Sequence, residues 1–386
     1  MLSIYIHIPF CKSRCFYCDF TTFAGKMSLI PAYIDSLKKE ISITSSHLDS
    51  FDPVYSIYFG GGTPSILEGA QIQEIISTIN QTFTVTSDAE ITLEANPADL
   101  TQEKAAAWKA AGINRVSLGM QSSAFQELKA MGRHHSFDQT AKDVQILRNS
   151  GIQNFSLDLI YGYPGQTLES WKSSLAAALS LQPKHISLYG LSIESGAILK
   201  KLIDSGKMIL PDEDLTAEMF HTAESILAKA GFIHYEISNW AAEEKFESRH
   251  NLQYWKVLPY LGFGVGASGN INHKRTHNCG NIEKYNSLLS QADAKSKLFP
   301  AADEILPQTE FLEMQDFMML GLRMLNTGAN PSAFKERFNK DFQTVFSKEI
   351  HHLMSRDLVK YGSEGQLILN QKYTLVANQA FMEFVD

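Results

Sequence analysis

The chain has 386 residues, 44% of them hydrophobic and 20% charged, which is enough for two or three domains, each with its own core. Its net charge of -8 at pH 7 excludes a strongly basic nucleic-acid surface, so small molecules or proteins are the expected partners, and no nucleic acid. No apolar run approaches the about 20 residues of a transmembrane segment, and four cysteines indicate no disulfide framework. We expect a cytoplasmic protein, for which peripheral membrane contact stays open.

Short β-branched or aromatic runs alternate with longer helical patterns along most of the chain, which is typical of βα units around a parallel sheet. The predicted strands are 3–8, 54–59, 89–93, 115–119, 154–160 and 185–191. The predicted helices are 31–46, 68–81, 101–111, 136–150, 167–181 and 212–230. Six such units predict an α/β fold whose chemistry lies in the loops after the carboxyl ends of the strands.

Three cysteines, Cys11, Cys15 and Cys18, follow the first predicted strand within one short loop. Zinc sites usually use two separated pairs, and a ferredoxin run has two-residue gaps and a fourth ligand. The C-x3-C-x2-C spacing can instead hold a 4Fe-4S cluster on three corners and leave one iron open. A disulfide is the alternative, but a bridge inside so short a loop constrains almost nothing. Cys279 is remote, and we expect a buried free thiol there.

This cysteine motif, with Tyr17 before its third cysteine, resembles the radical S-adenosylmethionine (SAM) superfamily. The resemblance implies a partial (β/α)6 TIM-like barrel and a 4Fe-4S cluster whose open iron is chelated by SAM. It also implies that one electron from the cluster cleaves SAM to a 5'-deoxyadenosyl radical, so that the cofactors carry the difficult chemistry.

The ends of the other strands carry motifs that resemble the same superfamily. Gly60-Gly61-Gly62-Thr63-Pro64 resembles its GGxTP motif, and the stretch from Asp158 to Thr167 resembles its D-L-I-x-G-x-P-G-Q-T element. From the residues alone, the glycines could form only a tight turn, Glu94 could be a solvated charge, and Arg133 could be exposed at a helix end. The SAM-binding residues implied by the resemblance are Tyr5, Tyr17, Gly61, Gly62, Thr63, Glu94, Gln121, Arg133 and Asp158.

Two features place the chain nearest the heme chaperone (HemW) branch of the oxygen-independent coproporphyrinogen III oxidase-like family. The oxidases have a fourth cysteine two residues after the third, where this chain has Phe20, and residues 250–255 match the H-N-x-x-Y-W motif of the chaperones. A neutral imidazole is a common heme ligand, so His250 is a candidate heme contact, although a lone histidine can equally be structural. Where relatives often read G-x-G-A-H-S, this chain has Ser268 in place of the histidine.

The organisation expected from these patterns has three parts. They are a barrel with the cluster and SAM site (1–230), an extension with the H-N-x-x-Y-W motif and a glycine-rich segment (231–302), and a C-terminal, mainly helical, winged-helix-like domain (303–386). We interpret the last part as a lid, a dimer contact or a docking surface.

Three functions are compatible with this reading of the sequence. The first is a cluster- and SAM-binding chaperone that carries heme to apo-hemoprotein acceptors and forms a homodimer. The second is an enzyme, the oxygen-independent coproporphyrinogen III dehydrogenase, which performs oxidative decarboxylation; the missing fourth cysteine argues against it. The third is a structural protein in which the cluster only stabilises the fold. Whether SAM is cleaved in normal function stays open.

Overall fold

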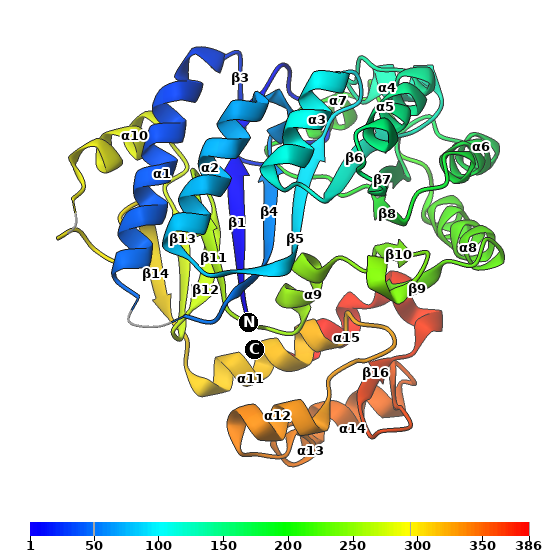
Figure 1. Cartoon of the computed structure of the whole chain (residues 1–386). Coiled ribbons are helices and arrows are strands. Elements are labelled where there is room, and N and C mark those ends of the chain that lie inside the picture. Colours follow the sequence, from blue (N-terminus) through cyan, green and yellow to red (C-terminus); the bar gives the residue numbers. More distant parts are fainter. Residues whose placement is uncertain (49–50, 294, 386) are drawn as a thin grey trace.

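The computed structural model describes residues 1–48, 51–293 and 295–385, and Figure 1 shows a sheet whose front face is covered by helices. Six parallel strands form the centre of this sheet: β1 (Leu2–Ile8), β4 (Val54–Gly61), β5 (Val85–Ala95), β6 (Arg115–Gln121), β7 (Asn154–Tyr161) and β8 (His185–Gly190). They lie side by side in chain order, and each neighbouring pair is parallel. The six predicted strands and their α/β arrangement are confirmed.

The six predicted helices are also present: α1 (Ile30–Ser46), α2 (Gly69–Thr82), α3 (Gln102–Ala111), α5 (Phe137–Asn149), α6 (Leu168–Ser180) and α8 (Glu213–Lys229). Side-chain caps fix several of their starts, since the side chains of Thr101, Ser136, Thr167 and Asp212 each accept a hydrogen bond from a backbone N–H in the first turn. The sequence did not predict α4 (Phe125–Ala130) and α7 (Ile198–Asp204), because so short a segment carries little periodicity.

Further strands extend both edges of the sheet. Beside β1 lie β11 (Tyr260–Phe263), which is parallel to it, and then the antiparallel strands β12 (Ser268–Ile271), β13 (Lys274–Asn278) and β14 (Ala302–Pro307). At the other edge, the segment 233–240 contains β9 (Ile233–Glu236) and the start of β10 (Asn239–Ala241). In the described residues the order is β14-β13-β12-β11-β1-β4-β5-β6-β7-β8-β10-β9. The sequence did not predict β11 to β14.

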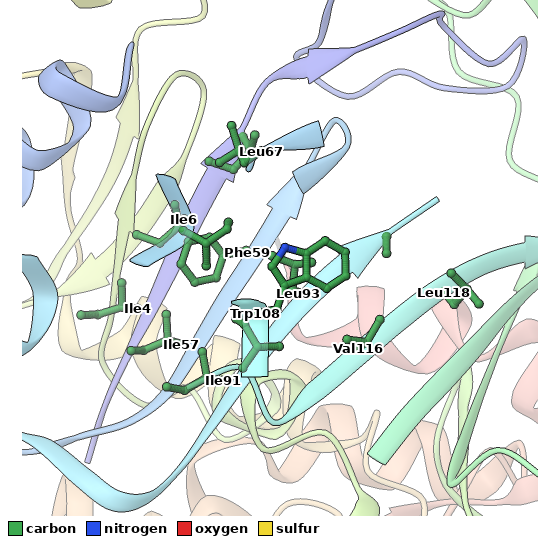
Figure 2. Packing of buried hydrophobic residues seen from close by; sticks show 14 of the residues in the cluster. Ile4, Ile6, Ile57, Phe59, Leu67, Ile91, Leu93, Trp108, Val116 and Leu118 are labelled. Atoms are coloured by element: carbon green, nitrogen blue, oxygen red, sulfur yellow. The ribbon is translucent and has the colours of Figure 1, made fainter. Parts of the chain in front are cut away.

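The two faces of the central strands differ in polarity. Ile4 and Ile6 of β1 and Ile57 and Phe59 of β4 are fully buried on the face that packs under the helices, together with Trp108 of α3 (Figure 2). Burying each such side chain contributes about 1.5–3 kcal/mol. Because successive residues in a strand point to opposite faces, the intervening residues turn to the inside of the curved sheet, and many of these are polar. The candidate site is built on that inner face.

The C-terminal region is mainly helical, as predicted, and packs around a second hydrophobic cluster. It contains α11 (Glu310–Gly321), α12 (Pro331–Phe338), α13 (Phe342–Val345), α14 (Ser347–Ser355), the hairpin of β15 (Val359–Tyr361) and β16 (Leu367–Leu369), and α15 (Asn378–Phe381). Phe334, Phe342 and Leu353 are fully buried in its cluster. Two more helices, α9 (Arg249–Trp255) and α10 (Ile282–Gln291), precede this region. None of the helices in the described ranges combines the length and the apolar character that crossing a membrane requires.

Candidate functional site

A cavity of about 590 Å³ lies at the carboxyl ends of the central parallel strands. It collects residues that are far apart in the sequence, because parallel strands bring their carboxyl ends to one edge. The predicted site residues that line it are Cys11, Cys15, Tyr17, Cys18, Gly61, Gly62, Thr63, Glu94, Gln121, Arg133 and Asp158. Tyr5 and His250, the other two predicted residues, do not line this cavity.

The three cysteines of the motif are free thiols on one wall of the cavity. Cys11 ends β2 (Phe10–Cys11) and is only 8% exposed, whereas Cys15 and Cys18 are half-buried. Burial raises the pKa of the Cys11 and Cys18 thiols, and the neighbouring thiols add to this effect. Three thiolates therefore need a strong cation close by to coexist here.

Within the described ranges, no three His, Cys, Asp or Glu side chains are arranged to hold a single metal ion. A 4Fe-4S cluster places each thiolate on a different iron, so its ligands need not converge on one point. The donor set, three free cysteines facing one cavity, fits such a cluster.

The glycine turn after β4 packs directly against the cysteine loop. The backbone N–H groups of Gly62 and Thr63 donate to the carbonyl oxygens of Ile8 and Phe10, both at 2.9 Å. A Cβ on Gly62 would lie 2.7 Å from the Phe10 oxygen and 3.0 Å from the Cys11 sulfur. Gly61 has φ +110°, and a Cβ there would lie 2.5 Å from the His7 ring. The glycines are therefore required for this close approach as well as for the turn.

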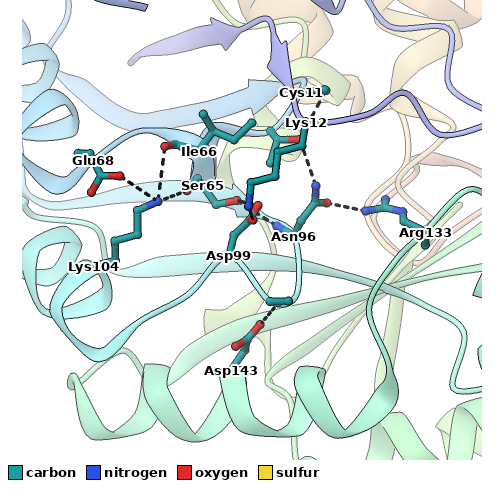
Figure 3. A network of polar contacts seen from close by, with 12 residues as sticks. Cys11, Lys12, Ser65, Ile66, Glu68, Asn96, Asp99, Lys104, Arg133 and Asp143 are labelled. Atoms are coloured by element: carbon teal, nitrogen blue, oxygen red, sulfur yellow. Dashed lines mark hydrogen bonds and ion pairs between the residues drawn. The ribbon is translucent and has the colours of Figure 1, made fainter. Parts of the chain in front are cut away.

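A chain of hydrogen bonds connects Arg133 to the first cysteine (Figure 3). Arg133 Nη1 donates to Asn96 Oδ1 at 2.5 Å, Asn96 Nδ2 donates to Thr63 Oγ1 at 3.1 Å, and Thr63 Oγ1 donates to Cys11 Sγ at 3.5 Å. Arg133 also donates to the Tyr17 hydroxyl from Nε at 3.1 Å and from Nη2 at 2.7 Å. The alternative of an exposed Arg133 is wrong, because its guanidinium is anchored in the wall of the cavity.

Two carboxylates, Glu94 and Asp158, lie on the inner face of the sheet in this cavity. Tyr58 donates its hydroxyl to Glu94 Oε1 at 2.8 Å, and Ser117 Oγ lies 2.9 and 3.0 Å from the two Asp158 oxygens. Burial raises the pKa of Glu94 to about 7, and the charge of Asp158 contributes in the same direction. Burial also raises the pKa of Asp158. Glu94 is thus not a solvated surface charge, and both groups are suited to accept hydrogen bonds from a hydroxyl-bearing ligand.

Gln121 has an unused acceptor at the end of β6. Its side chain is 7% exposed, and its Oε1 is buried without a hydrogen-bond partner in the described part of the chain. A buried acceptor without a partner costs about 1–3 kcal/mol. Its backbone has φ +61°, a conformation that is uncommon for a residue other than glycine. A ligand with an N–H or O–H donor would satisfy this oxygen.

His250 lies behind the site, with both ring nitrogens already engaged. Nδ1 is 3.0 Å from Ser56 Oγ, and Nε2 is 2.8 Å from the Tyr254 hydroxyl. The side chain is 1% exposed, and burial lowers its pKa to about 3. As a heme contact, His250 would have to break one of these hydrogen bonds. Tyr5 lines a neighbouring cavity instead, and its hydroxyl oxygen lies 3.0 Å from His7 Nδ1.

Three residues of the site, Tyr58, Asn96 and Ser117, were not identified from the sequence. The register pairs Glu94 with Ser117, so alternation along neighbouring strands could have placed Ser117 beside the carboxylates. Asn96 comes two residues after Glu94, directly after the end of β5, but nothing in the sequence indicates that it joins Arg133 to Thr63.

Known proteins resemble this chain along its whole length. The model of the radical SAM superfamily matches residues 5–178. The chain is 35% identical to the heme chaperone HemW of Bacillus subtilis over 386 residues, which cover 100% of this chain and 99% of that protein. It is 37% identical to the heme chaperone HemW of Haemophilus influenzae, with 96% of each chain covered.

Among solved structures, the coproporphyrinogen III oxidase HemN of Escherichia coli, described as a radical SAM enzyme, superimposes with a TM-score of 0.84 at 22% identity. The match covers 99% of this chain and 89% of that one. At this level of identity the likeness establishes the fold only.

Proposed function

Because this chain belongs to the radical SAM superfamily, and within it to the heme chaperone HemW family, we propose that it binds a 4Fe-4S cluster and SAM and delivers heme to acceptor hemoproteins. The single observation that supports cofactor binding is the shared cavity. Three free thiols, two half-buried carboxylates and a buried Gln121 oxygen without a hydrogen-bond partner in the described part of the chain line it together. The heme part is supported by relatives that span the full length of the chain and bear that name.

The proposed roles follow from the chemistry of each side chain. Cys11, Cys15 and Cys18 would hold the cluster, and Glu94 would accept hydrogen bonds from the ribose hydroxyls of SAM. The guanidinium of Arg133 is a suitable partner for a carboxylate, and Asp158 and the Gln121 oxygen can accept from donor groups of SAM. The glycine turn, with Gly61 and Gly62, would let backbone atoms approach the amino end of the ligand.

When bound, the cluster and SAM would supply one-electron chemistry at the sulfonium. The residues of this chain bind and orient these groups. Tyr17, which accepts two hydrogen bonds from Arg133, keeps the guanidinium directed at the cavity.

The competing function, the coproporphyrinogen III dehydrogenase, shares the fold but differs beside the third cysteine. This chain has Phe20 where the oxidases have a fourth cysteine, and Phe20 is 69% exposed at the rim of the site. We therefore expect no protoporphyrinogen from coproporphyrinogen III under anaerobic conditions. If the assay gave protoporphyrinogen, the protein would be a coproporphyrinogen III dehydrogenase.

The cluster is tested by anaerobic reconstitution with measurement of iron, sulfide and the visible absorption of the cluster. We expect Cys15→Ala to lose the cluster, whereas Cys279→Ala keeps it, because Cys279 is buried outside the cavity. Equal iron content in the two variants would overturn the assignment. Loss of SAM affinity in Glu94→Ala, with cluster content unchanged, would argue against a purely structural cluster.

The chaperone function is tested with heme itself. Reconstituted protein should bind ferric heme saturably and pass it to an apo-hemoprotein, and size-exclusion chromatography before and after cluster assembly tests for the proposed homodimer. A cytoplasmic location is part of the proposal, and sedimentation with anionic vesicles would reveal peripheral membrane contact. Absence of saturable heme binding, or of transfer, would refute this function.

A further inference from the structure

A second cavity, of about 810 Å³, lies next to the first on the inner side of the sheet. Its volume is in the range of sites that enclose a small-molecule ligand. Asp19 and Phe20, which follow the third cysteine, line both cavities. The two cavities therefore share a wall, so a ligand in the second one would lie beside the cysteine loop.

One wall of the second cavity is a single face of the antiparallel strands β12, β13 and β14. In the sheet, His277 of β13 lies between Ser268 of β12 and Glu304 of β14. Arg275, two residues before His277 in β13, is paired with Leu306 of β14. All five residues line the cavity, because side chains two apart in a strand share a face. His277 and Arg275 are thus held about 7 Å apart on a rigid sheet.

Aromatic and apolar side chains from two helices also line this cavity. They are Tyr254 and Trp255 from the end of α9 and Met319 from α11, and Figure 1 shows α11 below the sheet. The indole N–H of Trp255 is buried and has no hydrogen-bond partner in the described part of the chain. A flat apolar ligand could pack between these rings and the sheet, and an acceptor on it could satisfy the indole.

The histidines around the cavity differ in whether a ring nitrogen is available. His7 uses both, with Nδ1 3.0 Å from the Tyr5 hydroxyl and Nε2 2.8 Å from the Thr21 carbonyl oxygen. His277 is exposed, and its Nδ1 lies 3.0 Å from Ser268 Oγ. His277 lines the cavity, and among the described residues no hydrogen bond is made to its Nε2. A metal-binding histidine is commonly oriented in this way by a hydrogen bond to its other nitrogen.

Arg275 supplies a permanent positive charge on the same face. Its Nη2 pairs with Asp316 Oδ2 at 2.5 Å, and its side chain is still 45% exposed. A guanidinium has donors for a second carboxylate, so a ligand anion could join this pair.

We propose that the second cavity is the heme site of this protein, with His277 Nε2 as axial ligand to the iron, Arg275 as partner of a propionate, and Tyr254 and Trp255 packed along the macrocycle. This inference rests on the proposed heme binding and adds the location and the ligand. It assigns His250 a structural role, since both of its nitrogens are used within the protein. It also places the porphyrin beside the cysteine loop, with Phe20 between the two cavities.

The test is titration of the cluster-containing protein with ferric heme, followed by absorption and electron paramagnetic resonance. His277→Ala should weaken heme binding on the order of 100-fold and remove the spectrum of an imidazole-ligated heme. Ser268→Ala, which only releases Nδ1, should weaken it about 10-fold. Added imidazole should restore the ligated spectrum that His277→Ala loses, whereas with a merely structural His277 the variant would keep the ligated spectrum without imidazole. His351→Ala, an exposed histidine on α14, is the matched control and should bind as the unchanged chain does.

A change in the ligand tests the role of Arg275 without altering the protein. Heme with esterified propionates should bind the unchanged chain more weakly than heme with free propionates. In Arg275→Gln the affinities for these two forms of heme should be more similar. Heme binding that is unchanged in His277→Ala, or an imidazole-ligated spectrum that survives there, would overturn the site and leave the chaperone function standing. If the unchanged chain binds no heme, the proposed function itself fails.

Discussion

The side chain of Glu40 should make the free energy of unfolding depend on pH. It lies in α1, is 2% exposed, and connects that helix to Gly264 after β11, to the end of β13 and to α10. Tyr285 donates its hydroxyl to Glu40 at 2.6 Å, Asn278 Nδ2 at 2.7 Å, and the backbone N–H of Gly264 at 2.9 Å. Although three donors favour the charged carboxylate, burial outweighs them and raises the pKa of Glu40 to about 7.

The sign of the effect follows from this raised pKa. The folded chain holds the Glu40 proton more tightly than the unfolded chain, where the pKa is about 4.5. The free energy of unfolding therefore falls as pH rises from about 4.5 to about 7, and is flat above that. Since one pKa unit corresponds to about 1.4 kcal/mol, ionising Glu40 in the folded chain removes about 3 kcal/mol.

Urea unfolding of the unchanged chain and of Glu40→Gln at pH 5, 6, 7 and 8 measures this contribution. Because Gln cannot ionise, the free energy of unfolding of the unchanged chain should fall by about 2–3 kcal/mol relative to that of the variant between pH 5 and pH 8. Asp35→Asn, on the same helix but 77% exposed, is the control and should track the unchanged chain. A difference between the unchanged chain and Glu40→Gln that stays constant with pH, or changes in the opposite direction, would refute the reasoning.

Three further substitutions test individual contacts. Asn96→Ala removes the link between Arg133 and Thr63. Since one charge-assisted hydrogen bond contributes about 1.5 kcal/mol, we expect calorimetry to show an about 10-fold lower SAM affinity, with the iron content unchanged. An unchanged SAM affinity would contradict this. Thr167→Ala removes the N-cap of α6 and should cost about 1 kcal/mol in urea unfolding, without an effect on cofactor content. His250→Ala leaves a cavity and leaves the Tyr254 hydroxyl without its partner, while Ser56 keeps its hydrogen bond to Ser3, so the change should cost on the order of 2–4 kcal/mol. A stable variant that loses only heme would support a ligand role for His250.

The central sheet was predictable because each of its units carries its own local signal. The strands around Ile57 and Leu157 are short runs of buried apolar residues, and the helices between them begin with capping residues such as Thr101 and Ser136. The cysteine loop and the glycine turn were found because their spacing is rare. Strands β12 and β13 were not predicted because they are short and largely polar. Only their pairing with each other and with β14 makes them strands.

By itself, the sequence determined the alternation of strands and helices, the three neighbouring thiols and the positions at which polar residues end the strands, because these depend on residues close together in the chain. Only the tertiary structure decided which side chains face one another. It joined Arg133 to Cys11 through Asn96 and Thr63, and it gave both ring nitrogens of His250 a hydrogen bond. It left one ring nitrogen of His277 without a partner among the described residues. Those outcomes depend on strand register and on which groups burial leaves without water, and neither is encoded in any one segment of the chain.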